Sequence, residues 1–422
     1  MWKRYKAEIL IFCLAFGVRF IYAIAVWFLY GSHPFVAYSD AESFVRVAEN
    51  ILSHGVFSES YGAPFVPDSL RTPGYPLFLA LFLWLKVSFM GIAMIQNFFA
   101  GITAVLIYRL AKLLFFSASA GVIAALIFSF EPVSIYWSNL LMSDSLFGFL
   151  LILAAYLFVK NRLYWFAAVL GFSALVRPVG LYFFPIFLVA YSLRVYFEKS
   201  QNIFSVSKKA LVMICVFLTV LSPWFLRNKI VFDSWEFSSA GWVNLTIFTL
   251  AEFGRQHQIY VLIPSMASDY PGRGAIYEDD RDLRNINFYK NQFTRIVFSH
   301  PWEYFKFHIG STIKTFNYHG YQYLTKEVLQ AKMPWFGDTA ANLAVYIGNM
   351  LWLFIYGFAV FGLWKGEARF WQIFFAALVI VNALLLGDNG LMQGGRYSLP
   401  AMPFVLLLGG YGIWIFKKSF DT

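Results

Sequence analysis

Long apolar segments separated by short polar breaks dominate this chain. A membrane-spanning helix needs about 20 apolar residues, and ten segments approach or exceed that length, although 142–159 and 162–176 are short. The ten segments are 8–30, 91–113, 117–137, 142–159, 162–176, 178–196, 209–226, 342–363, 369–387 and 398–416. The pattern predicts an all-α polytopic membrane protein with about ten transmembrane helices.

The further apolar stretch 75–90 decides the topology. If it crosses the membrane, Arg109 and Lys112 fall outside and every later loop inverts. If it lies along the interface, most of the lysines and arginines of the short loops collect on one side, as cytoplasmic loops require. We therefore expect a juxtamembrane helix here, a first external loop over 31–90, and cytoplasmic N- and C-termini.

A second break, 227–341, is long and polar and falls on the external side. It contains two probable helices, 284–298 and 301–316, and the second is amphipathic rather than uniformly apolar. We expect a mixed extracytoplasmic segment with a thin core. The chain then divides into a transmembrane core (1–226), this loop segment, and C-terminal transmembrane helices (342–422).

Composition agrees with a membrane protein. Hydrophobic residues make up 59% of the 422 residues and charged residues 13%, against about 25% charged in soluble domains. The net charge of +10 is explained by basic cytoplasmic loops, so no nucleic-acid partner is expected. Cys13 and Cys215 lie within apolar runs and indicate buried thiols rather than a disulfide framework.

The first external loop opens with an acidic run, Ser39–Phe44. Ser39 and Glu42 have capping-box spacing, and an amphipathic pattern continues to Gly55, which predicts an interfacial helix over 40–54. Asp40 then lies in the first turn. It is either an acid that stabilises the helix dipole or a reactive group, whereas Glu42 is explained by capping.

The same loop ends in a rigid turn, Arg71–Pro76. Two prolines fix φ and Gly74 allows a tight bend. Arg71 could either cap a loop carbonyl or bind a lipid phosphate, since guanidinium pairs well with phosphate oxygens.

Other charged residues are predicted at the outer ends of spans. Acids this close to hydrocarbon are candidates for function, and guanidinium groups there could bind a lipid-linked phosphate or merely snorkel to the headgroups. The acids are Glu131 and Asp144, and the arginines are Arg177, Arg227 and Arg396. Arg19 lies inside the first span and is expected to find a structural partner within the bundle.

These pieces, in their order, resemble the GT-C glycosyltransferases. The resemblance is to the bacterial branch related to protein O-mannosyltransferases and lipid A aminoarabinose transferases (glycosyltransferase family 39-like). It covers most of the chain except much of 230–341. It rests on Ser39-Asp40-Ala41, on Arg71–Phe78, on Glu131-Pro132 with Leu141–Phe147, on Leu175–Pro178, on Pro223–Asn228 and on Arg396–Pro403.

The resemblance implies a polyprenyl-phosphate sugar donor, with Asp40 as catalytic base. It also implies juxtamembrane helices in the first loop. The chain departs from the family in having Asp144 where Glu is frequent, and in Ala41 separating Asp40 from Glu42. Large soluble C-terminal domains are also absent, so we expect a glycan or lipid acceptor in preference to a protein.

The expected reaction is inverting hexosyl or pentosyl transfer on the outer face of a bacterial cytoplasmic (inner) membrane. Arginines would neutralise the leaving phosphate while Asp40 accepts the acceptor's proton. No cofactor is expected to be required, although hard cations favour carboxylates and a divalent cation between Asp40 and Asp144 stays open.

Two other functions stay open. A lipid-linked sugar flippase or transporter would need titratable groups at mid-membrane, and most acids here lie at one face. An O-antigen polymerase or ligase would use arginines and a histidine in a long loop, and the segment 227–341 does contain four histidines, His257, His300, His308 and His319.

Overall fold

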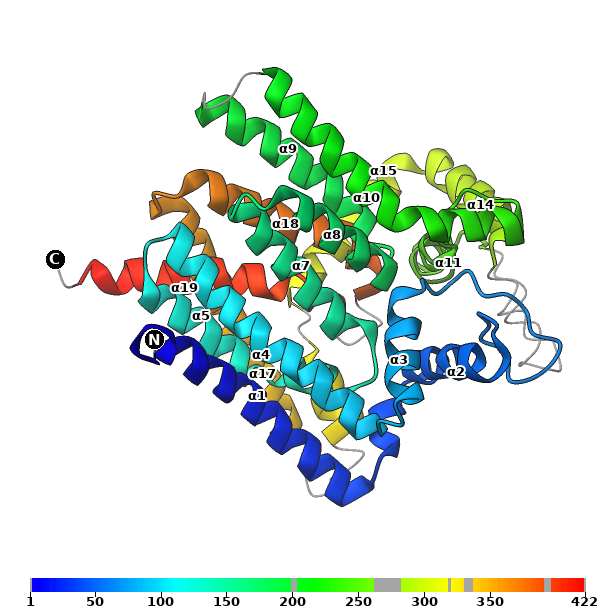
Figure 1. The fold of residues 1–422 in the computed structure, drawn as a ribbon, viewed down its shortest axis with the longest axis horizontal. Helices are drawn as coiled ribbons and strands as arrows, with labels where there is room; N and C mark the ends of the chain where they lie inside the picture. Colours follow the sequence, from blue (N-terminus) through cyan, green and yellow to red (C-terminus); the bar gives the residue numbers. More distant parts are fainter. Residues whose placement is uncertain are drawn as a thin grey trace.

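The computed structural model describes residues 2–198, 203–261, 282–317, 320–329, 337–390 and 396–420. In these residues the backbone forms helices joined by turns, and none of them lies in a β-strand. Figure 1 shows long helices packed into one body, with both termini at the same end of the molecule. The predicted all-α polytopic membrane fold is confirmed.

Six helices of the described chain are long and apolar enough to cross a membrane. They are α1 (Trp2–Tyr30), α4 (Phe89–Leu114), α9 (Gly180–Glu198), α10 (Ile203–Phe232), α17 (Asp338–Lys365) and α18 (Arg369–Gly390). A seventh crossing is formed if α5 (Ala118–Phe130) and α6 (Pro132–Asn139) are counted together, although the two are bent by 58°. Pro132 explains that break, because proline cannot supply the backbone N–H that continues a helix.

The predicted number of ten spans is larger than the number that passes this test. The other three segments are helical, as α7 (Ser143–Val159), α8 (Leu163–Val176) and α19 (Met402–Lys418), but they have only 17, 14 and 17 residues. At 1.5 Å per residue they rise about 21–26 Å, less than a hydrocarbon core of about 30 Å. Pro178 accounts for the end of α8, because the residue before a proline avoids the helical region.

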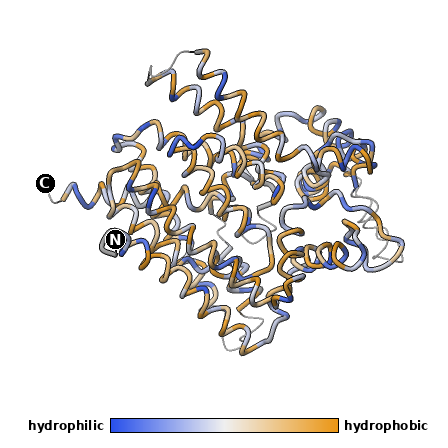
Figure 2. Tube along the Cα trace, viewed as in Figure 1, coloured by the Kyte–Doolittle hydropathy of each residue, from blue (hydrophilic) through white to orange (hydrophobic). Residues whose placement is uncertain are grey.

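The apolar core runs continuously from α1 to α19. Helix α4 packs against α1, α5 and α7, and α19 packs against α5 and α17. Buried side chains from all these helices form one cluster. Figure 2 shows hydrophobic residues along the long helices and more hydrophilic colouring at the loops and around the segment that follows α10.

Helix α2 (Ser39–His54) confirms the helix predicted over 40–54, with one correction. It ends at Gly55, whose φ of 67° is the left-handed conformation predicted for a terminating glycine. At the other end the N-cap residue is Tyr38, not Ser39. The predicted capping box is therefore wrong, and the Glu42 carboxylate accepts a hydrogen bond from Arg46 Nη2 at 3.0 Å instead.

The stretch 75–90 does not form a spanning helix. It holds α3 (Gly74–Trp84), whose 11 residues rise only about 16 Å, before a turn leads into α4. Helix α2 packs against α3, with the rings of Phe44 and Tyr75 edge to face at 4.9 Å. The two helices lie at the end of the molecule opposite the termini (Figure 1), as the topology prediction requires.

The long loop segment contains both predicted helices, as α14 (Ile286–Ser299) and α15 (Pro301–Asn317). In its described part, three small clusters of buried apolar residues form, and Phe237, Tyr321 and Leu324 join the main core instead. The acidic run Glu278–Asp280 lies outside the described residues. The shorter elements are η1 (His33–Val36), α11 (Ala240–Asn244), η2 (Leu245–Leu250), α12 (Ala251–His257), η4 (Leu283–Asn285), η5 (Tyr323–Leu329) and η6 (Arg396–Ser398).

Candidate active site

Three arginines and two aspartates form a continuous charge cluster beside α2 and α3. The Asp40 carboxylate accepts hydrogen bonds from Arg71 Nη2 at 2.7 Å and from Arg396 Nη1 at 2.5 Å. Arg396 Nε donates to Asp144 Oδ2 at 2.7 Å, and Arg177 Nη1 pairs with the other oxygen of Asp144. Charges of opposite sign therefore alternate along the cluster, and three guanidinium groups against two carboxylates leave one positive charge in excess.

The five residues come from five separate segments of the chain. Asp40 and Asp144 each lie in the first turn of a helix, α2 and α7, where the helix dipole stabilises a carboxylate. Arg71 lies in the turn before α3, Arg177 is the C-cap of α8, and Arg396 begins η6 just before α19. Each of the five was a candidate from the sequence, and the tertiary structure brings them together.

The cluster is open to solvent mainly at Asp40. The exposed fraction of the Asp40 side chain is 26%, and that of Arg71 is 14%. Asp144 is fully buried, and Arg396 is 3% exposed. A ligand that approaches from outside therefore reaches Asp40 and Arg71 first, while Asp144 holds the inner end of Arg396.

The protonation state of Asp40 is set by its two arginines. Burial raises the pKa of the Asp40 carboxyl, but the charges and hydrogen bonds of Arg71 and Arg396 outweigh burial and hold the pKa well below its usual range. Asp40 is therefore an anion at neutral pH, as expected, and a weaker base than an isolated aspartate while both arginines are bound to it.

Arg71 is held by groups that the sequence did not single out. Asp68 accepts the backbone N–H of Leu70 at 2.7 Å and that of Arg71 at 3.3 Å, which fixes the turn. Ser43 Oγ accepts from Arg71 Nε at 3.1 Å, and the guanidinium lies 4.6 Å from the centre of the Phe44 ring. Aspartate commonly caps a turn two residues on, and that local pattern could have identified Asp68.

Asp68 is itself perturbed. Burial and the nearby charge of Glu59 raise the pKa of its carboxyl to about 6, against the opposing effect of Arg71 and the two backbone hydrogen bonds. The Asp68 carboxyl therefore gains or loses its charge at mildly acidic pH, next to the turn that carries Arg71.

Aromatic rings enclose Arg396 on the other side. Its guanidinium carbon lies 5.7 Å from the ring centre of Tyr38 and 5.9 Å from that of Trp137. Trp137 in turn stacks on Tyr323 of η5 at 5.7 Å. Tyr323 was not a sequence candidate, because nothing local marks a tyrosine 73 residues before Arg396 in the chain. The rings fix the plane of the guanidinium and so its direction toward both aspartates.

Glu131 lies apart from the cluster and has a structural role. It is the N-cap of α6 and accepts the backbone N–H of Ser134 at 2.5 Å and the hydroxyl of Tyr321 at 3.1 Å. Arg19, fully buried, donates to Ser134 Oγ at 2.9 Å and to the carbonyl of Phe128 at 3.1 Å. This pair of interactions ties α1 to the break between α5 and α6, so the structural role predicted for Arg19 is confirmed.

Two more candidates do not join the cluster. Among the described residues, Glu42 pairs with Arg46 of the same helix, and its carboxylate is largely exposed. Arg227 lies between aromatic rings, 4.7 Å from the ring centre of Trp224 and 5.4 Å from that of Phe57, and donates to Asn228 Oδ1 at 3.0 Å.

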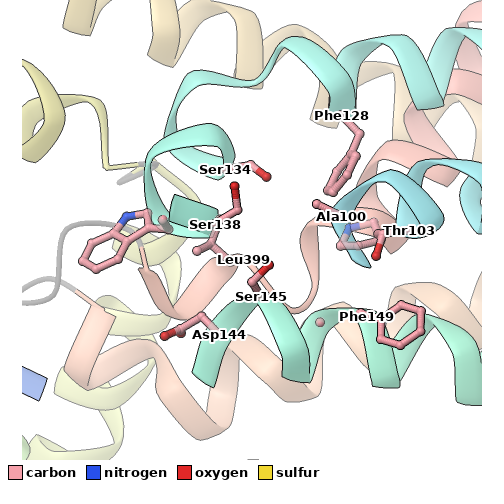
Figure 3. A pocket seen from close by; sticks show the side chains of 12 residues that line it. Ala100, Thr103, Phe128, Ser134, Ser138, Asp144, Ser145, Phe149 and Leu399 are labelled. Atoms are coloured by element: carbon pink, nitrogen blue, oxygen red, sulfur yellow. The ribbon is translucent and has the colours of Figure 1, made fainter. Parts of the chain in front are cut away.

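A small pocket adjoins Asp144 on the side of the spans. Figure 3 shows Asp144 and Ser145 on one side of it and Ser134 and Ser138 on the other, with Phe128 and Phe149 closing it. Its volume is about 30 Å³, which is enough for a water molecule and well below the roughly 300–1,000 Å³ of ligand pockets. A sugar therefore has no room here.

A cation site was considered between Asp40 and Asp144. In the described part of the chain, no group of three or more His, Cys, Asp or Glu side chains is arranged to hold a metal ion. The space between the two carboxylates is bridged by Arg396, whose charge opposes a second cation at the same point. Two of the four histidines that favoured a ligase face their own helices: ring nitrogens of His257 and His300 lie 3.0 Å and 3.3 Å from the carbonyl oxygens of Phe253 and Ile296. The ring of His308 stacks on Tyr304 at 6.0 Å, and His319 lies outside the described residues.

Part of the chain is similar to a known protein family. No curated protein matches the chain. Residues 70–226 match the family model described as dolichyl-phosphate-mannose-protein mannosyltransferase. The matched range contains Arg71, Asp144 and Arg177, three of the five residues of the charge cluster. That family is one of the GT-C families, so the match over residues 70–226 is consistent with a GT-C glycosyltransferase.

Proposed function

We propose that the protein transfers a sugar from a polyprenyl-phosphate donor to an extracytoplasmic acceptor, with inversion at the anomeric carbon and with Asp40 as the base. The observation that carries this proposal is the position of Asp40 between Arg71 and Arg396. A carboxylate that can take a proton then lies beside two groups that can bind a phosphate.

The reaction needs one bond to form and one to break. An acceptor hydroxyl attacks the anomeric carbon, the bond between that carbon and the phosphate oxygen breaks, and the electron pair leaves with the lipid phosphate. The hydroxyl proton passes to Asp40. The phosphate gains negative charge as it leaves, and planar guanidinium groups bind phosphate oxygens in a bidentate manner. No general acid is needed, because phosphate is already a good leaving group.

Donor binding would also strengthen the base. A donor phosphate competes with Asp40 for Arg71 and Arg396, and each hydrogen bond withdrawn from Asp40 raises the pKa of its carboxyl. Arg71 is the better candidate to move, because it is more exposed than Arg396 and bonds only one of the two aspartates. Asp40 therefore becomes a competent base when the donor is in place, and proximity supplies much of the rate.

The acceptor is proposed to be a glycan or a lipid rather than a protein. The matched family is described by protein mannosylation, but Ala41 separates the two acids of the first loop here, and Glu42 is turned to Arg46. The same proposal places the protein in a bacterial cytoplasmic membrane with the cluster on its outer side. A divalent cation stays an alternative only if it displaces Arg396 from between Asp40 and Asp144.

The test is transfer from a labelled polyprenyl-phosphate sugar by purified full-length protein, with glycan, lipid and peptide acceptors compared. Asp40→Asn should lower transfer by about 10²–10⁴-fold, because it removes the proton acceptor while preserving shape. Glu42→Gln is the matched control, since Glu42 lies in the same helical turn and pairs with Arg46, and it should transfer at the normal rate.

Three outcomes decide the assignment. Equal transfer by wild type and Asp40→Asn overturns the role of Asp40. If Glu42→Gln lowers transfer as much as Asp40→Asn does, the loss comes from disturbing the first turn of α2 and not from removing a base. Movement of the labelled lipid across vesicles without any transfer supports the transporter instead. Thermal unfolding of each variant shows whether a loss of transfer reflects unfolding.

A further inference from the structure

A second cavity lies at the opposite end of the molecule from the charge cluster, where the termini are. It is formed by the ends of four helices, α1, α4, α5 and α19, and its volume is about 580 Å³. That volume lies within the range of roughly 300–1,000 Å³ typical of ligand sites. Its walls are made by Ala7, Tyr108, Ala118, Ser119, Val122, Ile123, Trp414, Lys417 and Lys418.

The charge at the mouth of this cavity is positive. Lys417 and Lys418 are exposed, and the lining contains no acidic residue. Glu8 follows the lining residue Ala7, but its carboxylate is bonded to Arg109 Nη2 at 2.5 Å, which neutralises it. Lys112 adds a further positive charge nearby, with its Nζ 6.0 Å from the ring centre of Tyr108. An anion is therefore the favoured occupant.

The walls behind the two lysines suit an amphiphile. Val122, Ile123 and Ala7 give an apolar surface, while Trp414 and Tyr108 are of the type that sits at headgroup level. Lys418 Nζ lies 5.5 Å from the Trp414 ring, and that ring stacks on Tyr411 at 5.9 Å. Ser119 adds a hydroxyl at the same level.

We propose that this cavity binds an anionic phospholipid, with the phosphate between Lys417 and Lys418 and an acyl chain along Val122 and Ile123. Basic pockets between helices at a membrane surface recognise anionic headgroups in this way. A free phosphate would use the lysines but not the apolar wall, and a zwitterionic lipid would use the wall but gain less from the lysines. The site is independent of the proposed glycosyl transfer.

The experiment measures lipid binding to purified full-length protein by native mass spectrometry in detergent. Phosphatidylglycerol should bind to the wild type, and Lys417→Gln with Lys418→Gln should weaken it roughly 10- to 30-fold. The matched control is Lys160→Gln with Lys365→Gln, which removes the same charge from other exposed loops and should change binding little. Ser119→Trp, which fills the cavity at an exposed position without changing charge, should also weaken binding.

Each contrary result overturns the proposal. If Lys160→Gln with Lys365→Gln weakens phosphatidylglycerol binding as much as Lys417→Gln with Lys418→Gln, the lipid binds to general surface charge and not to this cavity. If phosphatidylcholine binds as tightly as phosphatidylglycerol, and Ser119→Trp weakens both equally, the cavity is an apolar groove without anion selectivity. Inorganic phosphate that competes fully with phosphatidylglycerol shows that the lysines alone bind the ligand. Thermal unfolding of every variant separates lost binding from lost folding.

Discussion

Arg396 is the residue on which the charge cluster depends, because it binds two aspartates through different nitrogens. Nη1 bonds Asp40 and Nε bonds Asp144. Lysine carries the same charge but has a single compact ammonium group, so it cannot reproduce this planar geometry. Asp144 is fully buried, and loss of the Arg396 bond would leave one of its two carboxylate oxygens without this partner, which costs free energy in a buried site.

Arg396→Lys should therefore lower kcat/KM for sugar transfer by about 10- to 100-fold, which corresponds to the loss of one charge-assisted hydrogen bond of roughly 1.5–3 kcal/mol. Steady-state kinetics with the polyprenyl-phosphate donor would measure it. The matched control is Arg255→Lys, since Arg255 pairs with Glu252 at an exposed position where ion pairs contribute little. Full activity in Arg396→Lys would refute the bridging role.

At the scale of elements, the short helix α3 positions Arg71 against the rest of the cluster. Gly74 begins α3 and lies directly against the end of α8. A Cβ atom at this position would lie 2.8 Å from the carbonyl carbon and oxygen of Leu175 and from the backbone nitrogen of Val176. Backbone atoms cannot move aside easily, so the close approach requires glycine. Arg71 lies three residues before Gly74, and Arg177 directly follows Val176.

Gly74→Ala should push α3 away from α8, with a stability cost of about 1–3 kcal/mol typical of overpacking and a loss of transfer activity. Thermal unfolding and the transfer assay would measure the two effects. Gly62→Ala is the matched control, because Gly62 lies in the same external loop with no atom near its Cβ position. If both variants behave like the wild type, α3 does not set the position of Arg71 through this contact.

At the scale of the whole molecule, the charge cluster and the termini lie at opposite ends (Figure 1). At the end with the termini, Arg109 pairs with Glu8 of α1, and Lys417 lies in the last turn of α19. Cytoplasmic loops carry an excess of lysine and arginine. The arrangement therefore predicts an outward-facing cluster and inward-facing termini.

Cys13 and Cys215 are exposed, so the prediction that both thiols are buried is wrong. Cysteine labelling would therefore test that orientation in a variant in which both are replaced by alanine. Gly62→Cys in the first loop should react with a membrane-impermeant maleimide added to sealed right-side-out membranes. Phe420→Cys, which is 74% exposed in the wild type near the C-terminus, should react only after the membranes are opened. The reverse pattern would place the cluster in the cytoplasm.

The sequence predicted most of the elements because their signals are local. The helix over 40–54, its end at Gly55, and the helices 284–298 and 301–316 all follow from periodicity and from glycine or proline at the boundaries. The start of α2 was misplaced by one residue, since Ser39 and Tyr38 compete for the N-cap position over a distance too short for a pattern to resolve. Each of the ten predicted spans contains a helix, and α7, α8 and α19 are the three whose 17, 14 and 17 residues fall below the length of a full crossing.

The candidate site was predicted residue by residue but not as a site. Asp40 and Arg71 were placed in one loop by topology alone, whereas Arg396 is 356 residues from Asp40 in the chain. Glu131 and Arg227 had the same local signals as Asp144 and Arg177, an acid or an arginine at the predicted outer end of an apolar span. Nothing in those signals says which side chains point to a common centre.

By itself, the sequence determined that the protein is an α-helical membrane protein, since apolar length and charge bias depend only on the order of residues. It also determined which charged residues stand at the membrane edge. Only the tertiary structure decided that Arg396 joins Asp40 to Asp144 while Glu131 caps α6 and Arg227 packs among aromatic rings. The physical reason is that a charge cluster built from five helix ends exists only after the helices have packed, because no pair of its bonded residues is close in the chain.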